Sequence, residues 1–124
     1  MSSASAADSD IGVKFAAIDA RYCAAFVAYL TDDATFRFGS APPVQGRVAI
    51  QEAVEGFFST IAGCSHDISN TLSSGDTLVC EGTVTYRRHD GSEVTLPFTD
   101  IFEFVGDRID QYKIYIDIAP LYAE

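Results

Sequence analysis

Two titratable side chains, Asp100 and His66, stand among apolar residues at spacings that permit chemistry. Residues 96–104 read LPFTDIFEF, and on a β-strand alternate side chains point to opposite faces. One face of this strand then carries Asp100 together with Leu96, Phe98, Phe102 and Phe104. A carboxylate in such a row is costly to desolvate unless it is protonated or paired. Asp100 is therefore the first candidate for a functional group.

His66 is the second candidate. Alternation over residues 64–72 places it on one face with Cys64, Ile68, Asn70 and Leu72. If the strands bring His66 and Asp100 together, the carboxylate–imidazole pair can tune an acid or base near neutral pH. In that hypothesis His66 abstracts or relays a proton and Asp100 orients it. Two alternatives stay open, in which Asp100 is a neutral donor to a developing enolate or carbonyl oxygen, or His66 is a structural core residue.

Aromatic and aliphatic residues at strand and helix spacing are candidates for the wall of a substrate pocket. Three tyrosines would supply hydroxyl groups, and the remaining residues would supply apolar surface suited to a flat ligand. The predicted substrate-binding residues are Tyr22, Phe38, Phe57, Tyr86, Phe102, Tyr112 and Ile114. The structural alternative is that these tyrosines are ordinary core residues.

The periodicity of apolar residues predicts the elements that position these groups. Helices are expected from Asp8 or Ser9 to Leu30 and over residues 48–61, where Gly63 stops the second. The expected buried stripe of the second helix is Ile50, Val54, Phe57 and Ile61. Alternation predicts strands over residues 34–38, 64–72, 78–87, 96–104 and 112–118.

Short turns between the last four strands imply antiparallel neighbours. The fold class is therefore α+β, with a strongly bent antiparallel sheet wrapped around the N-terminal helices and an internal pocket. Gly82 falls on the inward face of its strand, where its missing side chain is expected to leave room. Residues 1–10 are expected to be a flexible N-terminus, and residues 11–124 a single domain.

Composition excludes several classes of function. The chain has 18 acidic and 8 basic residues and a formal charge of −10, which argues against binding to nucleic acid or anionic membranes. The spacing of its 3 cysteines and 2 histidines matches no metal motif, and no glycine-rich nucleotide loop occurs, so no metal and no cofactor are expected. The absence of a signal peptide and of a spanning segment leads us to expect a cytoplasmic protein.

Four stretches resemble the SnoaL-like and ketosteroid-isomerase-like branch of the nuclear-transport-factor-2-like superfamily. They are YLTDDATFRF, APPVQGRVAIQEAVEGFF, TDIFEF and the terminal RIDQYKIYID, and the resemblance spans roughly residues 15–121. It implies a cone-shaped fold with an internal pocket. Its members include isomerases, polyketide cyclases, dehydratases, epoxide hydrolases and binding modules, so the fold alone does not select a reaction.

The resemblance carries over only part of the isomerase machinery. Asp100 matches the family's oxyanion-hole aspartate, which in ketosteroid isomerase is kept neutral by an apolar site. The position of the family's general base holds Phe38, and the partner aspartate of the epoxide-hydrolase pattern falls at Ile114. The family's YxD survives as Tyr115 and Asp117, both on the face away from the apolar row.

These observations favour a small cofactor-independent enzyme. It would isomerise, cyclise or dehydrate a hydrophobic carbonyl-bearing molecule by acid–base chemistry. The alternative is a non-catalytic module that binds a small apolar ligand. A third hypothesis is self-association, and a homodimer is expected through the outer sheet face that carries Tyr115, Ile101 and Val105.

Overall fold

A computed structural model describes residues 26–123 of the chain. Its elements, in order, are β1 (Leu30–Phe38), β2 (Val44–Gln45), α4 (Arg47–Phe58), β3 (Gly63–Ser74), β4 (Thr77–Arg87), β5 (Glu93–Val105), β6 (Arg108–Tyr115) and α5 (Ala119–Tyr122). The predicted α+β class is confirmed in this part of the chain. Most of the predicted N-terminal helix, including Tyr22, lies outside the described residues.

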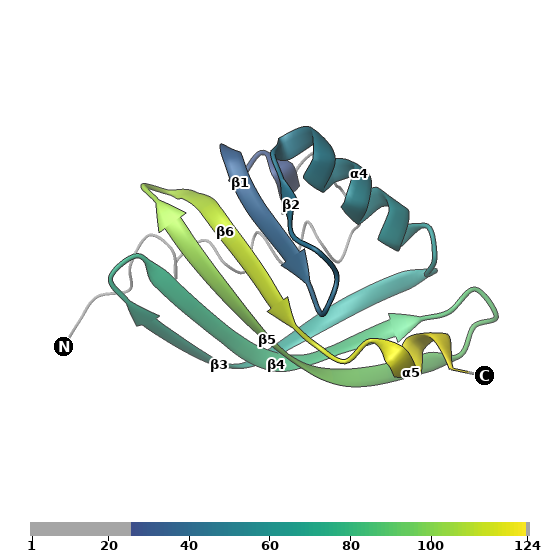
Figure 1. Cartoon of the computed structure of the whole chain (residues 1–124). Helices are drawn as coiled ribbons and strands as arrows, with labels where there is room; N and C mark the ends of the chain where they lie inside the picture. The colour runs from purple at the N-terminus through teal and green to yellow at the C-terminus, as the bar shows by residue number, and fades with distance from the viewer. Residues whose placement is uncertain (1–25, 124) are drawn as a thin grey trace.

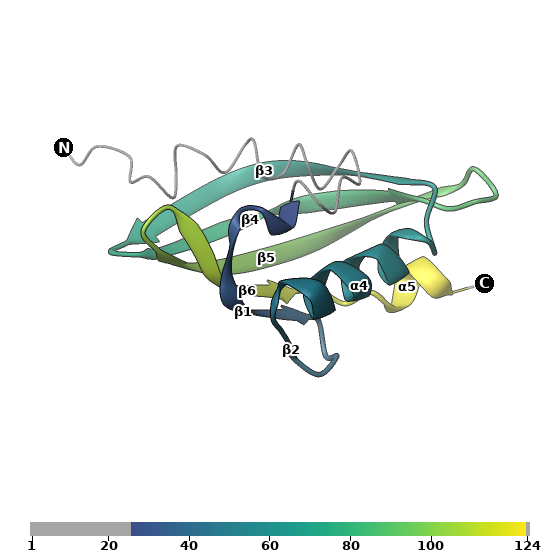
Figure 2. The same cartoon turned by 90° about the horizontal axis from the view of Figure 1, so that it is seen from above.

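The strands form one six-stranded sheet in the order β2-β1-β6-β5-β4-β3. The strands from β3 to β6 pair antiparallel with their neighbours in sequence, as their short turns predict. β1 instead lies parallel to β6, which returns from far along the chain to pair with it. Figure 1 shows the strong bend of the sheet, with α4 on its hollow side, and Figure 2 shows α4 beside β1 and β2 from above.

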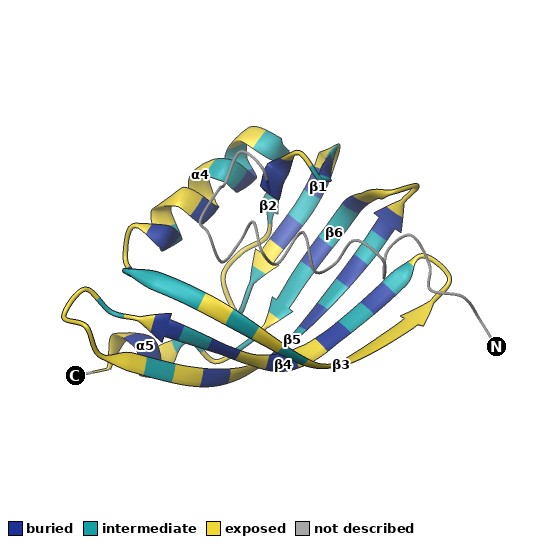
Figure 3. Cartoon of the chain, turned by 180° about the vertical axis from the view of Figure 1, so that it is seen from behind, coloured by how far each residue is buried: buried dark blue, intermediate teal, exposed yellow. Residues whose placement is uncertain are grey.

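Alternation along the strands divides the sheet into a dry face and a wetter face (Figure 3). β5 shows it best, because its five predicted inward residues are all buried: Leu96, Phe98, Asp100, Phe102 and Phe104. The predicted inward residues of β4 are buried as well: Leu78, Cys80, Val84 and Tyr86. The period of two therefore identified the core face of both strands.

A bulge in β3 reverses the alternation that the sequence predicts there. His66 pairs with Val84 before the bulge and Leu72 with Val79 after it, and the register shifts between Ile68 and Asn70. One extra residue moves every later side chain to the opposite face. Leu72, predicted inward, is accordingly 62% exposed.

Gly82 lies opposite Ile68 in the ladder, next to the bulge. A Cβ atom at Gly82 would overlap the carbonyl oxygen of Asp67 and come within 3.0 Å of Ile68 Cα. The expectation that Gly82 leaves room was therefore wrong, because backbone of the neighbouring strand fills that space.

The helix α4 ends earlier than predicted. It stops at Phe58, where the hydroxyls of Ser59 and Thr60 donate to the carbonyl oxygens of Gly56 and Phe57, at 2.6 and 2.7 Å. These hydroxyls add hydrogen bonds to carbonyl groups of the last helical turn, where the Phe57 carbonyl oxygen also accepts from the Thr60 amide at 2.9 Å.

The shorter helix changes the predicted stripe and the predicted stop. Its buried residues are Ile50, Val54 and Phe58, whereas Phe57 is only half-buried. Ile61 is buried but follows the helix, and Gly63, the predicted stop, instead begins β3.

Two predicted boundaries near β1 and β6 were also wrong. β1 begins at Leu30 rather than at residue 34, because Leu30 pairs with Ile109 and the amide of Ile109 donates to the carbonyl oxygen of Tyr29 at 2.7 Å. The last strand ends at Tyr115 rather than at residue 118. The short helix α5 follows, and its first amide, of Ala119, donates to Asp117 Oδ1 at 3.1 Å.

The outer face of the sheet carries the residues from which a homodimer was predicted. Tyr115 and Val105 are 49% and 62% exposed, and Ile101 is half-buried. The dimer stays a prediction that light scattering can check. Among the described helices, none has the length and apolar character needed to cross a membrane.

Candidate active site

A cavity of about 240 Å³ lies between α4, the loop after β1 and the dry face of the sheet. Its wall is almost entirely apolar and contains no Asp, Glu, Lys or Arg among the described residues. The lining residues are Phe26, Phe36, Phe38, Ala41, Pro42, Val44, Ala53, Val54, Phe57, Phe58, Cys64, His66, Tyr86 and Tyr112. A concave apolar site with a few polar groups is typical of small-molecule binding.

The strands and α4 position this wall through their local periodicity. Phe36 and Phe38 are two residues apart on β1 and therefore share a face, as Cys64 and His66 do on β3. Tyr86 lies directly opposite Cys64 in the ladder between β3 and β4. The polar atoms that these side chains bring to the wall are a thiol, an imidazole and a phenol, together with the phenol of Tyr112.

Tyr112 connects the cavity to Asp100. Asp100 is 1% exposed and lies outside the residues that line the cavity. The Tyr112 hydroxyl donates to Asp100 Oδ2 at 3.2 Å, and Asp100 Oδ1 has no hydrogen-bond partner among the described residues. The phenol of Tyr112 therefore connects the buried carboxyl group to the cavity wall.

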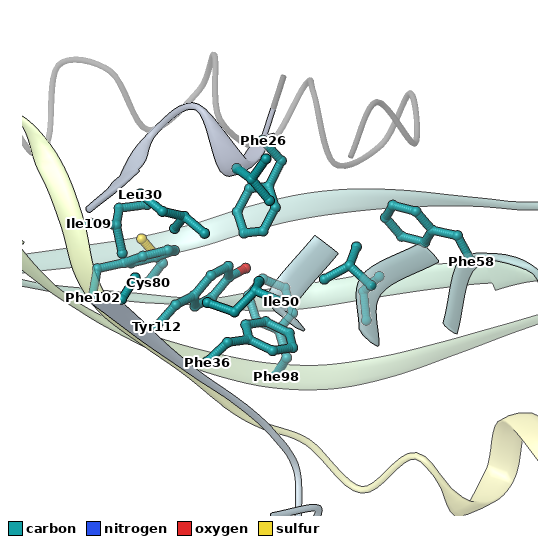
Figure 4. Close-up of a cluster of buried hydrophobic side chains, with 14 of the residues drawn as sticks. Phe26, Leu30, Phe36, Ile50, Phe58, Cys80, Phe98, Phe102, Ile109 and Tyr112 are labelled. Atoms are coloured by element: carbon teal, nitrogen blue, oxygen red, sulfur yellow. The ribbon is translucent and has the colours of Figure 1, made fainter. Parts of the chain in front are cut away.

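Aromatic packing holds the Tyr112 ring in place. Its centroid lies 4.4 Å from that of Phe102, and edge-to-face contacts join it to Phe36 at 5.5 Å and Phe26 at 5.7 Å. Figure 4 shows the ring of Tyr112 among these side chains. Three aromatic neighbours leave the ring little freedom, so its hydroxyl is held at one place in the wall.

Burial favours the protonated forms of Asp100 and Tyr112. Desolvation raises the pKa of Asp100 well above its usual range, and the hydrogen bond from Tyr112 opposes only part of that shift. Burial also raises the pKa of Tyr112, and the neighbouring Asp100 adds to the effect. Both shifts favour the protonated forms, so this end of the cavity is a source of hydrogen-bond donors.

The raised pKa of Asp100 predicts a specific dependence of stability on pH. Below the unfolded-state pKa, about 3.9, the side chain is protonated whether the chain is folded or not. Between that value and the raised pKa the folded protein binds more protons, so stability falls as pH rises, by at most about 1.4 kcal/mol per pH unit. Urea unfolding from pH 4 to 8 should show wild type losing stability relative to Asp100→Asn.

The Asp100→Asn variant is a suitable reference because an amide resembles the protonated acid in shape and does not titrate. It also keeps an oxygen that accepts the Tyr112 hydrogen bond. A wild-type protein that gained stability relative to this variant as pH rises would contradict the assignment of a raised pKa to Asp100.

The strand register keeps His66 away from Asp100. His66 pairs with Val84, which pairs with Leu96, and Asp100 lies four residues further along β5. That offset is roughly 13 Å along the strands and roughly 10 Å across two strand spacings, which is more than two side chains span. The register therefore does not bring together the carboxylate–imidazole pair of the hypothesis, and the ring of His66 stands edge-to-face against Phe98, with centroids 5.3 Å apart.

Comparisons with known proteins identify the family. The profile of the SnoaL-like domain matches residues 14–112, which is most of the chain. The chain belongs to the SnoaL-like domain family. No curated protein matches the sequence significantly.

Solved structures share the fold of this SnoaL-like domain at low sequence identity. A nuclear-transport-factor-2-like protein of unknown function from Burkholderia pseudomallei has a TM-score of 0.86 and 18% identity, over 95% of each chain. TerC, co-crystallised with polyporic acid, has a TM-score of 0.82 and 16% identity, over 95% of this chain and 96% of TerC. A candidate SnoaL-like polyketide cyclase from Shewanella putrefaciens has a TM-score of 0.81 and 12% identity, over 97% and 96%.

The site residues predicted from the sequence fall into three groups according to their position in the structure of this SnoaL-like domain. Five of them line the cavity: Phe38, Phe57, His66, Tyr86 and Tyr112. Three lie behind or beside the lining residues: Asp100, Phe102 and Ile114, of which Phe102 stacks on Tyr112 and Ile114 pairs with Asp100. Tyr22 lies outside the described residues.

Several residues that line the cavity were not among the site residues predicted from the sequence. Phe36 and Cys64 share strand faces with the predicted Phe38 and His66, so alternation was a signal that could have found them. The loop residues Ala41 and Pro42 carry no such signal. No group of three or more potential metal ligands occurs among residues 26–123, and the wall offers mainly carbon atoms.

Proposed function

We propose that this SnoaL-like domain is a cofactor-independent enzyme that performs acid–base chemistry on a hydrophobic, carbonyl-bearing small molecule. The observation that carries the proposal is the hydrogen bond between Tyr112, on the wall of an aromatic cavity, and the buried Asp100 behind it. A phenol backed by a neutral acid donates to an oxygen on which negative charge develops. The small-molecule site is also consistent with TerC, a protein of the same fold that was co-crystallised with polyporic acid.

In this proposal Tyr112 binds the carbonyl oxygen of the substrate. When Asp100 is protonated, its own O–H donates to the Tyr112 oxygen, and the phenol proton is then free to point into the cavity. Chains of hydrogen bonds polarise one another in a low dielectric, so the buried acid strengthens the phenol as a donor. Asp100 acts through Tyr112 and does not itself line the cavity.

His66 is the proposed base, because its imidazole lines the same cavity and histidine is the side chain that most often serves as a general base. It removes a proton from the carbon next to the carbonyl, and the electron pair of that C–H bond forms an enolate whose oxygen accepts the Tyr112 hydrogen bond. If the substrate carries a β,γ double bond, the resulting dienolate takes the proton back from His66 at the γ-carbon, which gives isomerisation. Attack of the enolate on a second carbonyl carbon of the same molecule gives cyclisation, and the alkoxide that forms takes the proton from His66. Loss of a β-hydroxyl group gives dehydration, with the hydroxide leaving as water after it takes that proton.

Exchange of hydrogen for deuterium tests the common step of these three reactions. The protein is incubated in D₂O with 2-acetylnaphthalene, a flat neutral ketone, and deuterium uptake at its methyl group is followed by mass spectrometry. We expect wild type to accelerate the exchange. His66→Ala should lower the accelerated rate on the order of 100-fold, since general-base catalysis typically contributes that much or more.

The same assay separates an enzyme from a binding module. The nearly apolar wall of the cavity is compatible with an enzyme and with a binding module, because in either case its four polar side chains are enough to orient a bound ligand. If 2-acetylnaphthalene binds but exchanges no faster than in buffer, the module is favoured and the proposed acid–base chemistry is wrong.

A further inference from the structure

The entrance of the cavity can be located from the exposure of its wall. Three of the lining residues are exposed, namely Ala41 and Pro42 in the loop after β1 and Ala53 on α4. The other described lining residues are buried or half-buried. The cavity therefore opens to solvent between this loop and α4.

The ring of Phe57 lines the cavity one helical turn after Ala53, the α4 residue at this entrance. Its centroid is 4.9 Å from that of Phe38, at the end of β1, and 5.5 Å from that of Tyr86, on β4, at an interplanar angle of 80°. Phe57 thus bridges from α4 to two strands on the opposite wall. Its own side chain is half-buried, as expected for a ring that has the cavity on one side and solvent on the other.

The helix explains why Phe57 faces the entrance rather than the core. Ile50, Val54 and Phe58 follow one another at intervals of four residues and form the buried row of α4. Ala53 and Phe57 form the adjacent row, displaced by one residue, and both line the cavity. Ala53 is small, so the Phe57 ring is the largest group that α4 places at the entrance.

We propose that Phe57 determines the size of the ring system that this cavity admits. This inference rests on the proposed function, in that it takes the occupant to be a neutral, planar, carbonyl-bearing molecule. The occupant's rings pass between Phe57 and the loop at Ala41 and Pro42, and its carbonyl reaches Tyr112. Phe57 is a specificity-determining residue, and no proton transfer is assigned to it.

Three methyl ketones of increasing size test this assignment: acetophenone, 2-acetylnaphthalene and 2-acetylanthracene, with one, two and three fused rings. Their dissociation constants are measured by equilibrium dialysis for wild type, Phe57→Leu and Phe57→Trp. We expect Phe57→Leu to improve the affinity for the three-ring ketone relative to the one-ring ketone at least tenfold. Phe57→Trp should shift the same ratio in the opposite direction.

Phe104→Leu is the matched control. Phe104 is 5% exposed, lies on β5 and does not line the cavity, so the same chemical change there disturbs the core without widening the entrance. Its ratio of affinities should equal that of wild type, even if the variant is less stable. A change in Phe104→Leu as large as in Phe57→Leu would overturn the role of Phe57.

The outcomes separate this inference from the proposed function. If wild type binds the ketones but both Phe57 variants keep the wild-type ratio, Phe57 does not select by size and the proposed function is unaffected. If wild type binds none of the three ketones, the proposed ligand class is wrong and the role of Phe57 is overturned with it.

Discussion

Tyr112→Phe should lower the catalysed deuterium exchange of a bound ketone by about 100- to 1,000-fold, the usual loss when one oxyanion donor is removed. The substitution deletes a single oxygen atom. It removes the phenol oxygen at the cavity wall together with its hydrogen bond to Asp100 Oδ2, and it keeps the ring that packs on Phe102, Phe36 and Phe26. The loss should therefore appear in kcat rather than in folding.

Unfolding in urea checks that the structure survives the change. Loss of one hydrogen bond should reduce stability by only about 0.5–1.5 kcal/mol. Tyr115→Phe is the matched control, because Tyr115 is exposed on the outer face of β6, away from the cavity. If Tyr112→Phe exchanges deuterium within threefold of the Tyr115→Phe rate, Tyr112 is not the donor.

Gly82→Ala should destabilise the protein by about 3 kcal/mol or more, which is a large effect for one methyl group. The new Cβ would overlap the carbonyl oxygen of Asp67 and press on Ile68 Cα, and all of these atoms are backbone. Backbone in a paired strand cannot move aside without breaking ladder hydrogen bonds. The bulge at residues 68–70 would have to rearrange, and with it the strand that carries His66 and Cys64.

Gly56→Ala makes the same chemical change with the opposite expected sign. Gly56 lies in α4, and a Cβ there meets nothing within 4 Å. Alanine should stabilise the helix by about 0.5–1 kcal/mol. Urea unfolding of both variants at one pH measures the contrast, and equal effects at the two positions would refute the close approach of β3 to Gly82.

The sequence predicted the dry face of the sheet because alternation is a local property. In β5 each inward residue is two positions from the next, so the face on which Asp100 lies follows from the chain itself. The same reasoning failed at Leu72, since a bulge inserts one residue without any signal in the pattern of apolar side chains. The prediction that Phe57 belongs to the buried stripe of α4 was also wrong. The helix ends at Phe58, and Phe58 rather than Phe57 is buried with Ile50 and Val54.

The candidate site was likewise predictable from the sequence only in part. Asp100 was recognisable from the sequence because burying a carboxylate among phenylalanines has a cost that demands an explanation. Its partner was not recognisable, since His66 and Tyr112 both had the required parity. The register of four paired strands, with a shift between β5 and β6, places the Tyr112 hydroxyl at Asp100 and His66 well away from it.

What the sequence alone determined, then, is the existence of every strand except β2, the dry face of β4 and β5, and the buried acid on that face, because these follow from spacing along the chain. Tertiary structure decided the parallel pairing of β1 with β6, the partner of Asp100 and the contact of Phe57 with Phe38. Each of these depends on contacts between residues distant in sequence, set by the bend of the sheet and the packing of α4 on it (Figure 1). No periodicity encodes such contacts, and their energies decide among arrangements that the local pattern allows equally.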